Sequence, residues 1–551
     1  MEEEIKKLIE GEVSSTRKML DLYSHDTSLF EVRPELIVFP KNPDDIKKLV
    51  KYVTQKKSDN QHIAITARSG GTDMSGGSIN DSIILAFEKH FNKIGTIRNN
   101  KIKVEPGVYY RNFDKKTKAH KKIMPSYPAS REICMVGGMV ANNAGGEKSL
   151  VYGKTERYVR SLKVVLADGN EYTIKPLKKE ELDKKIKQSN FEGVIYKQLF
   201  KLLDDNYEHI KNSKPPVTKN STAYNLWNIW DRETGVFDLT QLFVGSQGTI
   251  GIITEIEFGL VDYKPESGLL VGYVENLHDL AKIIQVVLKH KPTSFEAFDD
   301  QTIKFATRFF FQFIKTLGFW KWLKTAIAFI PDALILAKDI IFERHFPRLV
   351  MLVEFEGTDQ DEITNKLHDL KLDLKQFDLD TEIADTKGKS ERYWLMRRES
   401  FNLLRKNVKN KHTAPFIDDL VVPPYDLPKF IPELEKVLEK YNLLETIVGH
   451  IGDGNFHIIP LMDLTDKKER DKIEPCLNEV IKLVKKYNGS ISGEHNDGLI
   501  RGPFIEKMYG KKMFDLFVDT KKIMDPYNIF NPHKKTDATW KYSHVHMRDH
   551  F

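Results

Sequence analysis

The sequence IAITARSGGTDMSGGSINDSIILAF, residues 63–87, places a glycine-rich loop between two apolar runs. Both runs, residues 63–66 and 83–87, are typical of buried β-strands. The four glycines of the loop allow unusual φ values, and successive N–H groups can then form one concavity that suits a pyrophosphate. An ordinary glycine-rich hairpin loop would show the same pattern, so this stretch by itself leaves both interpretations open.

Two further segments are dense in small residues. Residues 134–146 read CMVGGMVANNAGG, with Val-Tyr-Gly following at 151–153, and residues 243–255 read FVGSQGTIGIITE. Such segments allow a flat cofactor or its diphosphate to lie against the main chain. The pattern G-x-G-x-x-G is absent from the sequence, so the fingerprint of a Rossmann dinucleotide site is missing. A nucleotide would have to be held in another way.

A third group of residues has the donors of a metal site. Residues 449–457 read GHIGDGNFH, and Gly-Glu-His follows at 493–495. His450, His457 and Glu494 offer imidazole and carboxylate ligands, which suit a borderline divalent metal, and three protein ligands leave positions open for a substrate. His495 is a candidate base beside that metal. Histidines are often packing residues, and the chain has 17 of them, so the cluster gains its weight from the segments upstream.

Together these motifs resemble the FAD-linked oxidases of the vanillyl-alcohol oxidase/PCMH flavoprotein superfamily. The chain is most similar to the branch of D-lactate dehydrogenases, glycolate oxidase flavin subunits and D-2-hydroxyglutarate dehydrogenases. Its glycine-rich loop, GG-x4-NAGG, GS-x-GT-x-GIITE, GH-x-GDGN-x-H and GEH with a closing Asn531-Pro532 stand in the order of that family. The resemblance runs from about residue 30 to about residue 535.

The resemblance implies an FAD-binding site. Its expected residues are Arg68, Ser69, Gly70, Gly71, Thr72, Asp73, Ser75, Gly76, Pro125, Gly137, Gly138, Asn142, Ala144, Gly145, Gly153, Ile252, Ile253 and Asn531. Some superfamily members attach FAD to a histidine in the glycine-rich loop. This loop has Thr72-Asp73 instead, so we expect non-covalent FAD.

The resemblance also implies a reaction. A 2-hydroxy acid of the D-lactate or glycolate type would pass hydride to flavin N5, assisted by zinc or manganese on His450, His457 and Glu494. His495 would accept the hydroxyl proton. Arg397 matches the arginine of a W-x-x-R motif that clamps the substrate carboxylate in relatives, although a surface arginine on a charged helix would also fit the local sequence.

Two alternatives remain for the function. One is a dehydrogenase of D-2-hydroxyglutarate or another larger 2-hydroxy acid. Some relatives carry a lysine for the distal carboxylate, whereas no basic residue lies between Pro415 and Pro424 here, which weakly disfavours a dicarboxylate. The other is a flavin-binding subunit of an oxidase complex without chemistry of its own, which would have no use for the histidines and the glutamate.

The fold class follows from the resemblance and the alternation of apolar runs. We expect an α+β protein with a two-lobed PCMH-type FAD-binding domain, an α/β cap with an antiparallel sheet, and a C-terminal helical segment that returns to the flavin domain. The expected parts are an N-terminal helix and lead-in (1–29), the FAD-binding domain (30–262), the cap or substrate domain (263–470) and the C-terminal segment (471–551). A helix is expected to begin near residue 46, and strands at residues 269–274 and 349–355.

Residues 305–345 form an apolar, aromatic and lysine-containing insertion in the cap. No uncharged run in it approaches the roughly 20 residues that span a bilayer. An enlarged core element or a dimer contact is one interpretation. The other is a peripheral membrane contact through residues 309–341, which would bring the protein to a quinone.

Composition limits the partners and the compartment. Lys and Arg number 85 against 79 Asp and Glu, and this excess of +6 is too weak to indicate nucleic acid. Two isolated cysteines, Cys134 and Cys476, cannot ligate an iron–sulfur cluster, so we expect a quinone or a separate iron–sulfur protein to take the electrons. The charged start of the chain argues against a signal peptide and predicts a cytoplasmic protein. The membrane interpretation of residues 309–341 would place it peripherally on the inner face of the cell membrane.

Overall fold

The computed structural model describes residues 1–59, 61–299, 347–384, 386, 388–395, 397, 411–443 and 447–550. The apolar insertion, residues 305–345, lies outside these residues, and so does the proposed membrane contact at 309–341. Within the described ranges no helix combines the length and the apolar character that crossing a bilayer requires.

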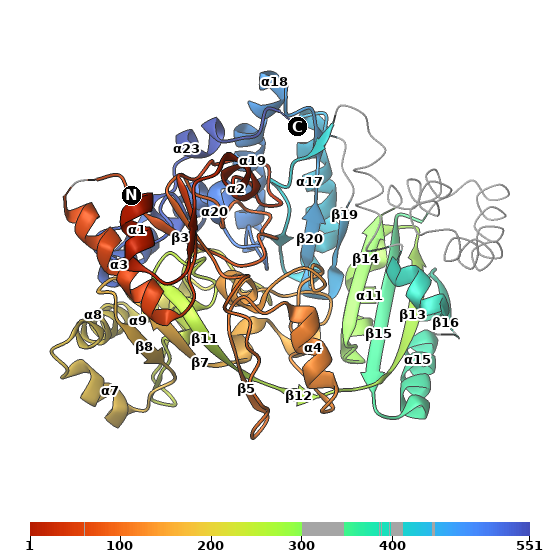
Figure 1. The fold of residues 1–551 in the computed structure, drawn as a ribbon. Coiled ribbons are helices and arrows are strands. Elements are labelled where there is room, and N and C mark those ends of the chain that lie inside the picture. Colours follow the sequence, from red (N-terminus) through yellow and green to blue (C-terminus); the bar gives the residue numbers. More distant parts are fainter. Residues whose placement is uncertain are drawn as a thin grey trace. The chain divides into compact units, whose positions relative to one another are not determined.

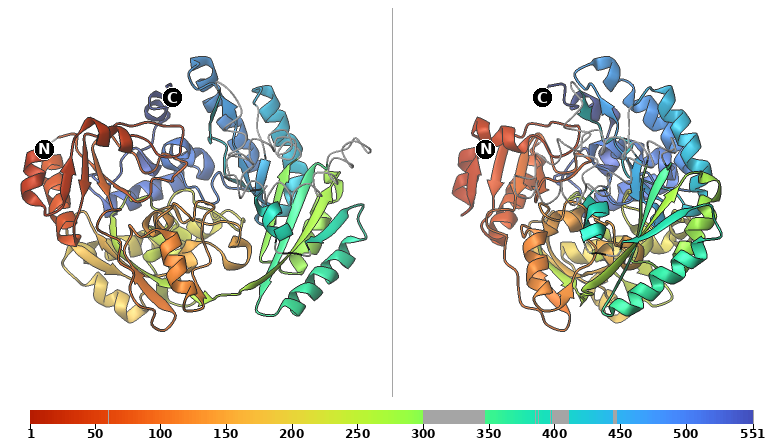
Figure 2. Two further views of the ribbon diagram at one scale, coloured as in Figure 1. Left: turned by 45° about the vertical axis from the view of Figure 1, so that its right-hand side comes forward. Right: turned by 90° about the vertical axis from the view of Figure 1, so that its right-hand side faces the viewer.

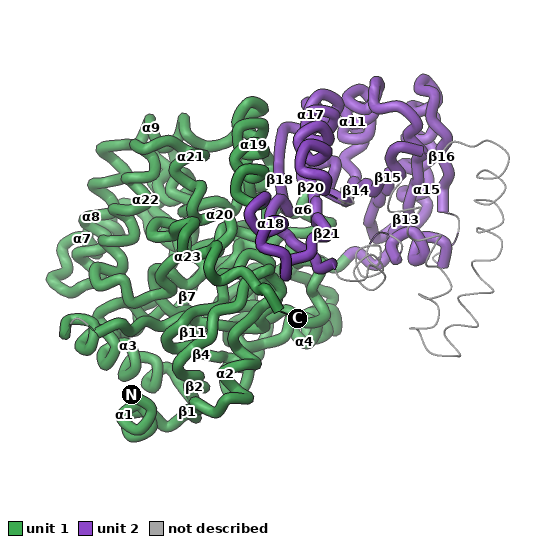
Figure 3. The backbone as a smooth tube through the Cα atoms, turned by 90° about the horizontal axis from the view of Figure 1, so that it is seen from above, with its two compact units in different colours: residues 1–263, 473–551 green, residues 264–472 purple. Residues whose placement is uncertain are grey.

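The chain divides into two compact units (Figure 3). Unit 1 comprises Met1–Tyr263 and Ile473–Phe551, and unit 2 comprises Lys264–Lys472. Helices and strands occur in both, which confirms the predicted α+β class (Figure 1). The C-terminal residues belong to the same unit as the N-terminal ones, so unit 1 is built from two stretches that are far apart in the sequence.

The first lobe of unit 1 is a four-stranded sheet in the order β1-β2-β4-β3. Its strands are β1 (Glu12–Ser14), β2 (Leu36–Phe39), β3 (Ile65–Arg68) and β4 (Ile83–Ala86), with α1 (Glu2–Leu8), α2 (Arg17–Tyr23) and α3 (Pro43–Ser58). The helix α3 starts at Pro43 because the side chain of Asn42 accepts the N–H of Asp45 and proline is well placed at the first turn. Strands β3 and β4 run parallel, so the glycine-rich loop is a crossover between parallel strands and not the hairpin that remained open above.

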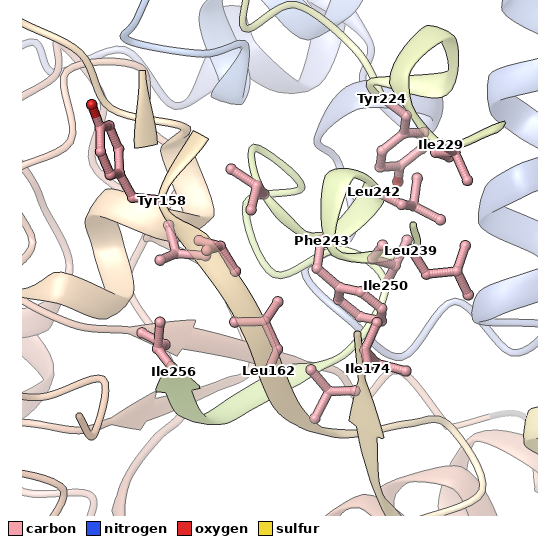
Figure 4. Close-up of a cluster of buried hydrophobic side chains, with 14 of the residues drawn as sticks. Tyr158, Leu162, Ile174, Tyr224, Ile229, Leu239, Leu242, Phe243, Ile250 and Ile256 are labelled. Carbon is pink, nitrogen blue, oxygen red and sulfur yellow. The ribbon is translucent and has the colours of Figure 1, made fainter. Parts of the chain in front are cut away.

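The second lobe of unit 1 is an antiparallel sheet in the order β5-β11-β7-β8. Its strands are β5 (Lys101–Val104), β7 (Val159–Val165), β8 (Glu171–Ile174) and β11 (Ile252–Gly259), accompanied by α4 (Tyr110–Lys118), α5 (Val136–Asn142), α6 (Ser149–Tyr152), α7 (Lys179–Ile186), α8 (Phe191–Asp205), α9 (Tyr207–Asn212) and α10 (Thr240–Phe243). Short strand pairs β6 (Lys122–Ile123) with β12 (Val261–Asp262), and β9 (Trp230–Asp231) with β10 (Val236–Phe237), lie outside this sheet. Phe243 and Ile250 pack with Leu162 of β7 and Ile174 of β8 in the lobe's buried core (Figure 4).

Residues 473–550 complete unit 1 with helices. These are α19 (Ile473–Lys486), α20 (Gly498–Arg501), α21 (Ile505–Tyr509), α22 (Lys511–Met524) and α23 (Trp540–Val545). Phe517 of α22 lies in the core of the second lobe, and Phe530 lies in the core of the first. The C-terminal stretch therefore packs on both lobes.

Unit 2 contains a seven-stranded antiparallel sheet in the order β16-β13-β15-β14-β19-β20-β18. The strands are β13 (Glu266–Val274), β14 (Ser294–Asp299), β15 (Leu349–Gly357), β16 (Asp380–Ala384), β18 (Leu420–Val421), β19 (Ile447–His450) and β20 (Asn455–Ile458), and a separate pair joins β17 (His412–Thr413) to β21 (Leu461–Met462). Its helices are α11 (Leu280–Lys289), α15 (Gln360–Leu374), α17 (Leu427–Lys440) and α18 (Lys467–Arg470). Helix α15 lies along β13 and β15 (Figure 2). The expected strands at 269–274 and 349–355 thus fall inside β13 and β15.

Candidate active site

The glycine-rich loop begins where β3 ends and presents backbone donors. Among the residues that the structure describes, the N–H groups of Gly70, Gly71 and Thr72 donate no hydrogen bond. Gly71 has φ +63°, and a Cβ there would lie 2.3 Å from a guanidinium nitrogen of Arg68, so only glycine fits. Three successive N–H groups that donate no hydrogen bond within the described residues fit a pyrophosphate.

Asp73 organises the other half of this loop. Its Oδ2 accepts hydrogen bonds from the Ser75 N–H (3.2 Å), the Ser75 hydroxyl (2.8 Å) and the Gly77 N–H (2.5 Å). Its Oδ1 accepts one from Asn142 Nδ2 at 2.9 Å. The Asp73 side chain therefore holds the loop with one oxygen and joins it to Asn142 with the other.

The small-residue segments converge on the same loop. The side chain of Gln247 donates to Ser75 Oγ at 3.1 Å, which ties the segment 243–255 to the loop. Asn531 donates to the carbonyls of Gly77 (2.8 Å) and Gln247 (2.7 Å). A Cβ at Gly137 would lie 2.7 Å from Ser69 Oγ, so the segment 134–146 touches the loop as well. Gln247 was not singled out from the sequence, although it stands inside a motif that was.

The other expected flavin residues have several local roles. Arg68 is buried and donates to the backbone carbonyls of Tyr23 and His25. Gly153 has φ +70° and ends α6. Gly76 has φ +82°, and Gly138 lies in α5 against Ser69. Pro125 and Ala144 are buried. Ile252 belongs to the core of the first lobe, whereas Ile253 is half-buried on β11.

Unit 1 also brings the flavin segments to Glu494. A Cβ at Gly145 would lie 2.8 Å from Glu494 Oε2, so the glycine makes room for this carboxylate. Lys219 Nζ donates to the same oxygen at 3.1 Å, and both side chains are buried. The Nε2 of His495 lies 3.9 Å from Glu494 Oε1. Lys219 does not stand out in the sequence, since it lies 275 positions from Glu494.

The backbone around Glu494 is fixed by a second buried lysine. Lys154 Nζ donates to the carbonyl of Gly493 at 2.9 Å and to Ser221 Oγ at 2.7 Å. The Ser221 N–H donates to the carbonyl of Ser492 at 2.9 Å. Glu494 is thus held through its main chain as well as through its side chain.

In unit 2 a tight hairpin sets His450 and His457 side by side. His450 ends β19 and His457 lies on β20, which pairs with β19 so that Val448 is opposite His457. Because side chains alternate between faces of a strand, both imidazoles project from the same face. Their rings are 5.2 Å apart between centroids, and a nitrogen of each lies within 4.8 Å of the other. Gly454 in the turn has φ +67°, and a Cβ there would lie 1.8 Å from the carbonyl of Val422.

Buried carboxylates hold both rings. His450 Nδ1 lies 2.6 Å from Glu296 Oε1, and His457 Nδ1 lies 3.0 Å from Asp418 Oδ1. Glu296 and Asp418 are fully buried. Since Nδ1 of each ring donates to a carboxylate, Nε2 is the nitrogen that can bind a metal, which is the usual arrangement around metal-ligating histidines. Neither carboxylate was singled out as a site residue from the sequence.

Arg397 is buried on the same side of this sheet. It follows the helical residues 388–395 and lies three positions after Trp394, which packs with Phe298 and Leu352. Its Nη2 forms an ion pair with Glu296 Oε2. Arg397 is therefore not the surface arginine that the local sequence would also have allowed.

Two family models match the chain. The FAD binding domain matches residues 34–175, and the C-terminal domain of FAD linked oxidases matches residues 269–535. These ranges cover the glycine-rich loop, the paired histidines and Glu494.

Proteins of known name are similar over most of the chain. D-2-hydroxyglutarate dehydrogenase from Pseudomonas putida is 26% identical over 531 residues, which cover 95% of this chain and 50% of that protein. Glycolate oxidase subunit GlcD from Bacillus subtilis is 25% identical over 93% of this chain and 91% of its own length. D-lactate dehydrogenase from Archaeoglobus fulgidus is 24% identical over 91% of this chain and 90% of its own length. The chain spans about half the length of the first of these relatives.

Solved structures share the fold. The 4-ethylphenol oxidase from Gulosibacter chungangensis aligns with a TM-score of 0.67 at 16% identity, over 98% of this chain and 97% of that one. The p-cresol methylhydroxylase structure aligns with a TM-score of 0.67 at 17% identity, over 97% and 96%. The two domain matches show that the chain belongs to the FAD-linked oxidases, with their FAD-binding domain followed by their C-terminal domain.

Proposed function

We propose that this protein is an FAD-dependent dehydrogenase that oxidises a small 2-hydroxy acid, of the D-lactate or glycolate type, to the 2-oxo acid. The observation that carries the proposal is the pair of imidazoles on one face of the unit 2 sheet, each held at Nδ1 by a buried carboxylate. Such an arrangement is unusual for packing histidines and typical of metal ligands. The named relatives, a glycolate oxidase subunit and D-lactate and D-2-hydroxyglutarate dehydrogenases, support the class of substrate.

The residues fit a divalent metal. His450 and His457 would supply Nε2, and Glu494 is proposed as the third ligand on the order of the sequence motifs. Two imidazoles and one carboxylate suit zinc or manganese and leave a position for the substrate. The Lys219 ammonium favours the charged form of the Glu494 carboxylate, which is the form that binds a cation.

The remaining chemistry is divided among a few side chains. FAD would supply the hydride acceptor, its N5, and a divalent metal held by His450, His457 and Glu494 would lower the pKa of the substrate hydroxyl. Arg397 binds the substrate carboxylate with its planar guanidinium and so orients the Cα–H. His495 accepts the hydroxyl proton, a role typically worth about 10²–10⁴-fold in rate. The Cα–H leaves as hydride and the hydroxyl proton leaves to His495, so the product is the carbonyl.

D-2-hydroxyglutarate is the second candidate substrate. The relative from Pseudomonas putida carries that name and is similar over 95% of this chain. Against it stands the segment 416–420, which has two aspartates and no basic side chain, and one of them, Asp418, is used to hold His457. A non-catalytic flavin-binding subunit is disfavoured because it has no use for the histidines and their carboxylates.

The electron acceptor and the place of action are proposed on the sequence alone. A quinone or a separate iron–sulfur protein would take the electrons, since the two cysteines are too few for a cluster. We propose a cytoplasmic protein, with residues 309–341 as its contact to the membrane surface. Pelleting with anionic liposomes of the full chain and of a variant lacking 309–341 tests this contact, and equal pelleting would refute it.

Anaerobic reduction of the flavin tests the function. The metal-replete protein is mixed in turn with D-lactate, L-lactate, glycolate and D-2-hydroxyglutarate while the flavin absorbance near ~450 nm is followed. Bleaching by D-lactate or glycolate that a chelator abolishes is the expected result. A clear preference for D-2-hydroxyglutarate would establish the second candidate, and a yellow protein that none of the acids bleaches would contradict the proposal.

A further inference from the structure

Glu296 occupies a central position in the unit 2 sheet. It lies on β14, between β15 and β19, and its residue is fully buried. Phe298 pairs with Val448 of β19, so the antiparallel register places Glu296 opposite His450. Directly opposite side chains project from the same face, and the local strand geometry therefore sets the Glu296 carboxylate against the imidazole.

The two oxygens of this carboxylate have different partners. Oε1 lies 2.6 Å from His450 Nδ1, and Oε2 forms the ion pair with Arg397. The side chains of all three residues are at most 7% exposed. A buried carboxylate is costly unless its charge is compensated, and here one cationic side chain and one imidazole share that task.

We propose that Glu296 is a positioning residue that aims His450 at the metal and Arg397 at the substrate carboxylate at the same time. This inference rests on the proposed function, since it assumes that His450 binds a metal and that Arg397 binds the acid. Its consequence is that metal affinity and carboxylate recognition depend on one side chain. Asp418 is the corresponding carboxylate at the other histidine, because its Oδ1 lies 3.0 Å from His457 Nδ1.

Substitutions can separate the two contacts of Glu296, the one with His450 and the one with Arg397. In Glu296→Gln the amide oxygen can still accept the Nδ1–H of His450, but the amide nitrogen would face the Arg397 guanidinium, donor against donor. Glu296→Ala removes both contacts. Asp418→Ala is the matched control, since it removes the carboxylate that lies against the other histidine, His457.

Two binding measurements on the flavin-loaded full chain test the proposal. Zinc and manganese are titrated into metal-free protein by calorimetry, and oxalate, a carboxylate ligand that cannot be oxidised by hydride loss, is titrated through the flavin spectrum. KM and kcat are measured with the acid that bleaches the flavin. Glu296→Gln should raise the oxalate Kd and KM about tenfold or more while metal affinity changes little. Glu296→Ala should lower metal affinity as well, by about 10–100-fold.

The control gives the contrasting pattern. Asp418→Ala should lower metal affinity by a similar factor with a smaller change in the oxalate Kd at saturating metal. If Glu296→Gln leaves the oxalate Kd and KM unchanged, or lowers metal affinity as much as Glu296→Ala, the proposal is wrong. Should Glu296→Ala not fold, the comparison of Glu296→Gln with Asp418→Ala decides by itself. A wild-type protein that binds no metal and that no acid bleaches would refute the proposed function, whereas an active wild type with an unaffected Glu296→Gln refutes only this inference.

Discussion

In unit 1 the carboxylate of Glu494 accepts a hydrogen bond from the buried Lys219, whereas in unit 2 the imidazoles of His450 and His457 lie against the buried carboxylates of Glu296 and Asp418. The lysine compensates the charge of a candidate ligand before any metal arrives. The carboxylates of Glu296 and Asp418 act on neutral imidazoles instead, whose tautomer they fix and whose basicity they raise. In each unit a buried, charged side chain thus orients a candidate ligand, an ammonium for the carboxylate and carboxylates for the imidazoles.

The largest effect is expected from removing a ligand in either unit. His457→Ala and Glu494→Ala should both lose the metal, and turnover should fall by more than the roughly 10–100-fold that loss of an outer partner costs. Metal content after gel filtration and anaerobic bleaching are the measurements. His278→Ala, which changes an exposed histidine of unit 2, is the control and should behave as wild type. A metal retained in one of the two ligand variants would break the comparison, since the substituted residue would then not be a ligand.

The next effect concerns the base. His495→Ala should reduce kcat by about 10²–10⁴-fold and leave flavin and metal bound, because it removes proton acceptance but no ligand. Stopped-flow reduction of the flavin, together with its absorbance spectrum and metal content, measures this. Unchanged turnover would exclude His495 as the base, and loss of metal would move it from base to ligand.

Substitution of Lys219 and substitution of Asp418 should change the stabilisation by added metal in opposite directions. Lys219→Met leaves the Glu494 carboxylate buried without this ammonium, so the metal-free protein should lose about 3–5 kcal/mol of unfolding free energy. Added metal should then stabilise it more than it stabilises wild type. Asp418→Ala weakens a metal ligand, so added metal should stabilise that variant less. Urea unfolding with and without metal measures the stabilisation by metal in each variant. A change of the same sign in both variants, relative to wild type, would show that Lys219 and Asp418 act on their ligands in the same way.

The smallest effect concerns Asp26 of unit 1, a buried carboxyl that accepts a hydrogen bond from the Ser78 hydroxyl next to the glycine-rich loop. Burial, followed by the charge of Asp73, raises the pKa of Asp26 to about 7. The raised pKa means that the protonated form stabilises the fold fully below about pH 4 and that this contribution is lost as pH rises towards 7.

The Asn side chain in Asp26→Asn is uncharged at any pH, so this variant should not lose stability in this way as pH rises. Its unfolding free energy relative to wild type should therefore rise by about 1–2 kcal/mol between pH 5 and pH 8, since one pKa unit is worth about 1.4 kcal/mol and Asp73 shares the charge. Urea unfolding at the two pH values checks this, with the exposed Asp59→Asn as control. Parallel pH profiles for wild type and Asp26→Asn would show that the acidic pair carries no such cost.

Local features of the site were predictable from the sequence. The strands on either side of the glycine-rich loop and the need for glycine at Gly71 follow from apolar runs and backbone sterics. Alternation along two short strands places His450 and His457 on one face once the hairpin between them is recognised. The helix near residue 46 also follows, from the cap at Asn42. What was missed, Glu296, Asp418, Gln247 and Lys219, has in common that each acts on a residue distant in the sequence.

The sequence by itself therefore determined the order of the motifs, the resemblance to the FAD-linked oxidases that they carry, and the candidate site residues, because short-range spacing and side-chain chemistry encode these features. The tertiary structure alone decided which groups hold them. His450 and Glu296 are 154 positions apart, and Glu494 and Lys219 are 275 apart. No periodicity links such positions, because a buried charge finds its partner through sheet register and packing, which depend on the whole chain.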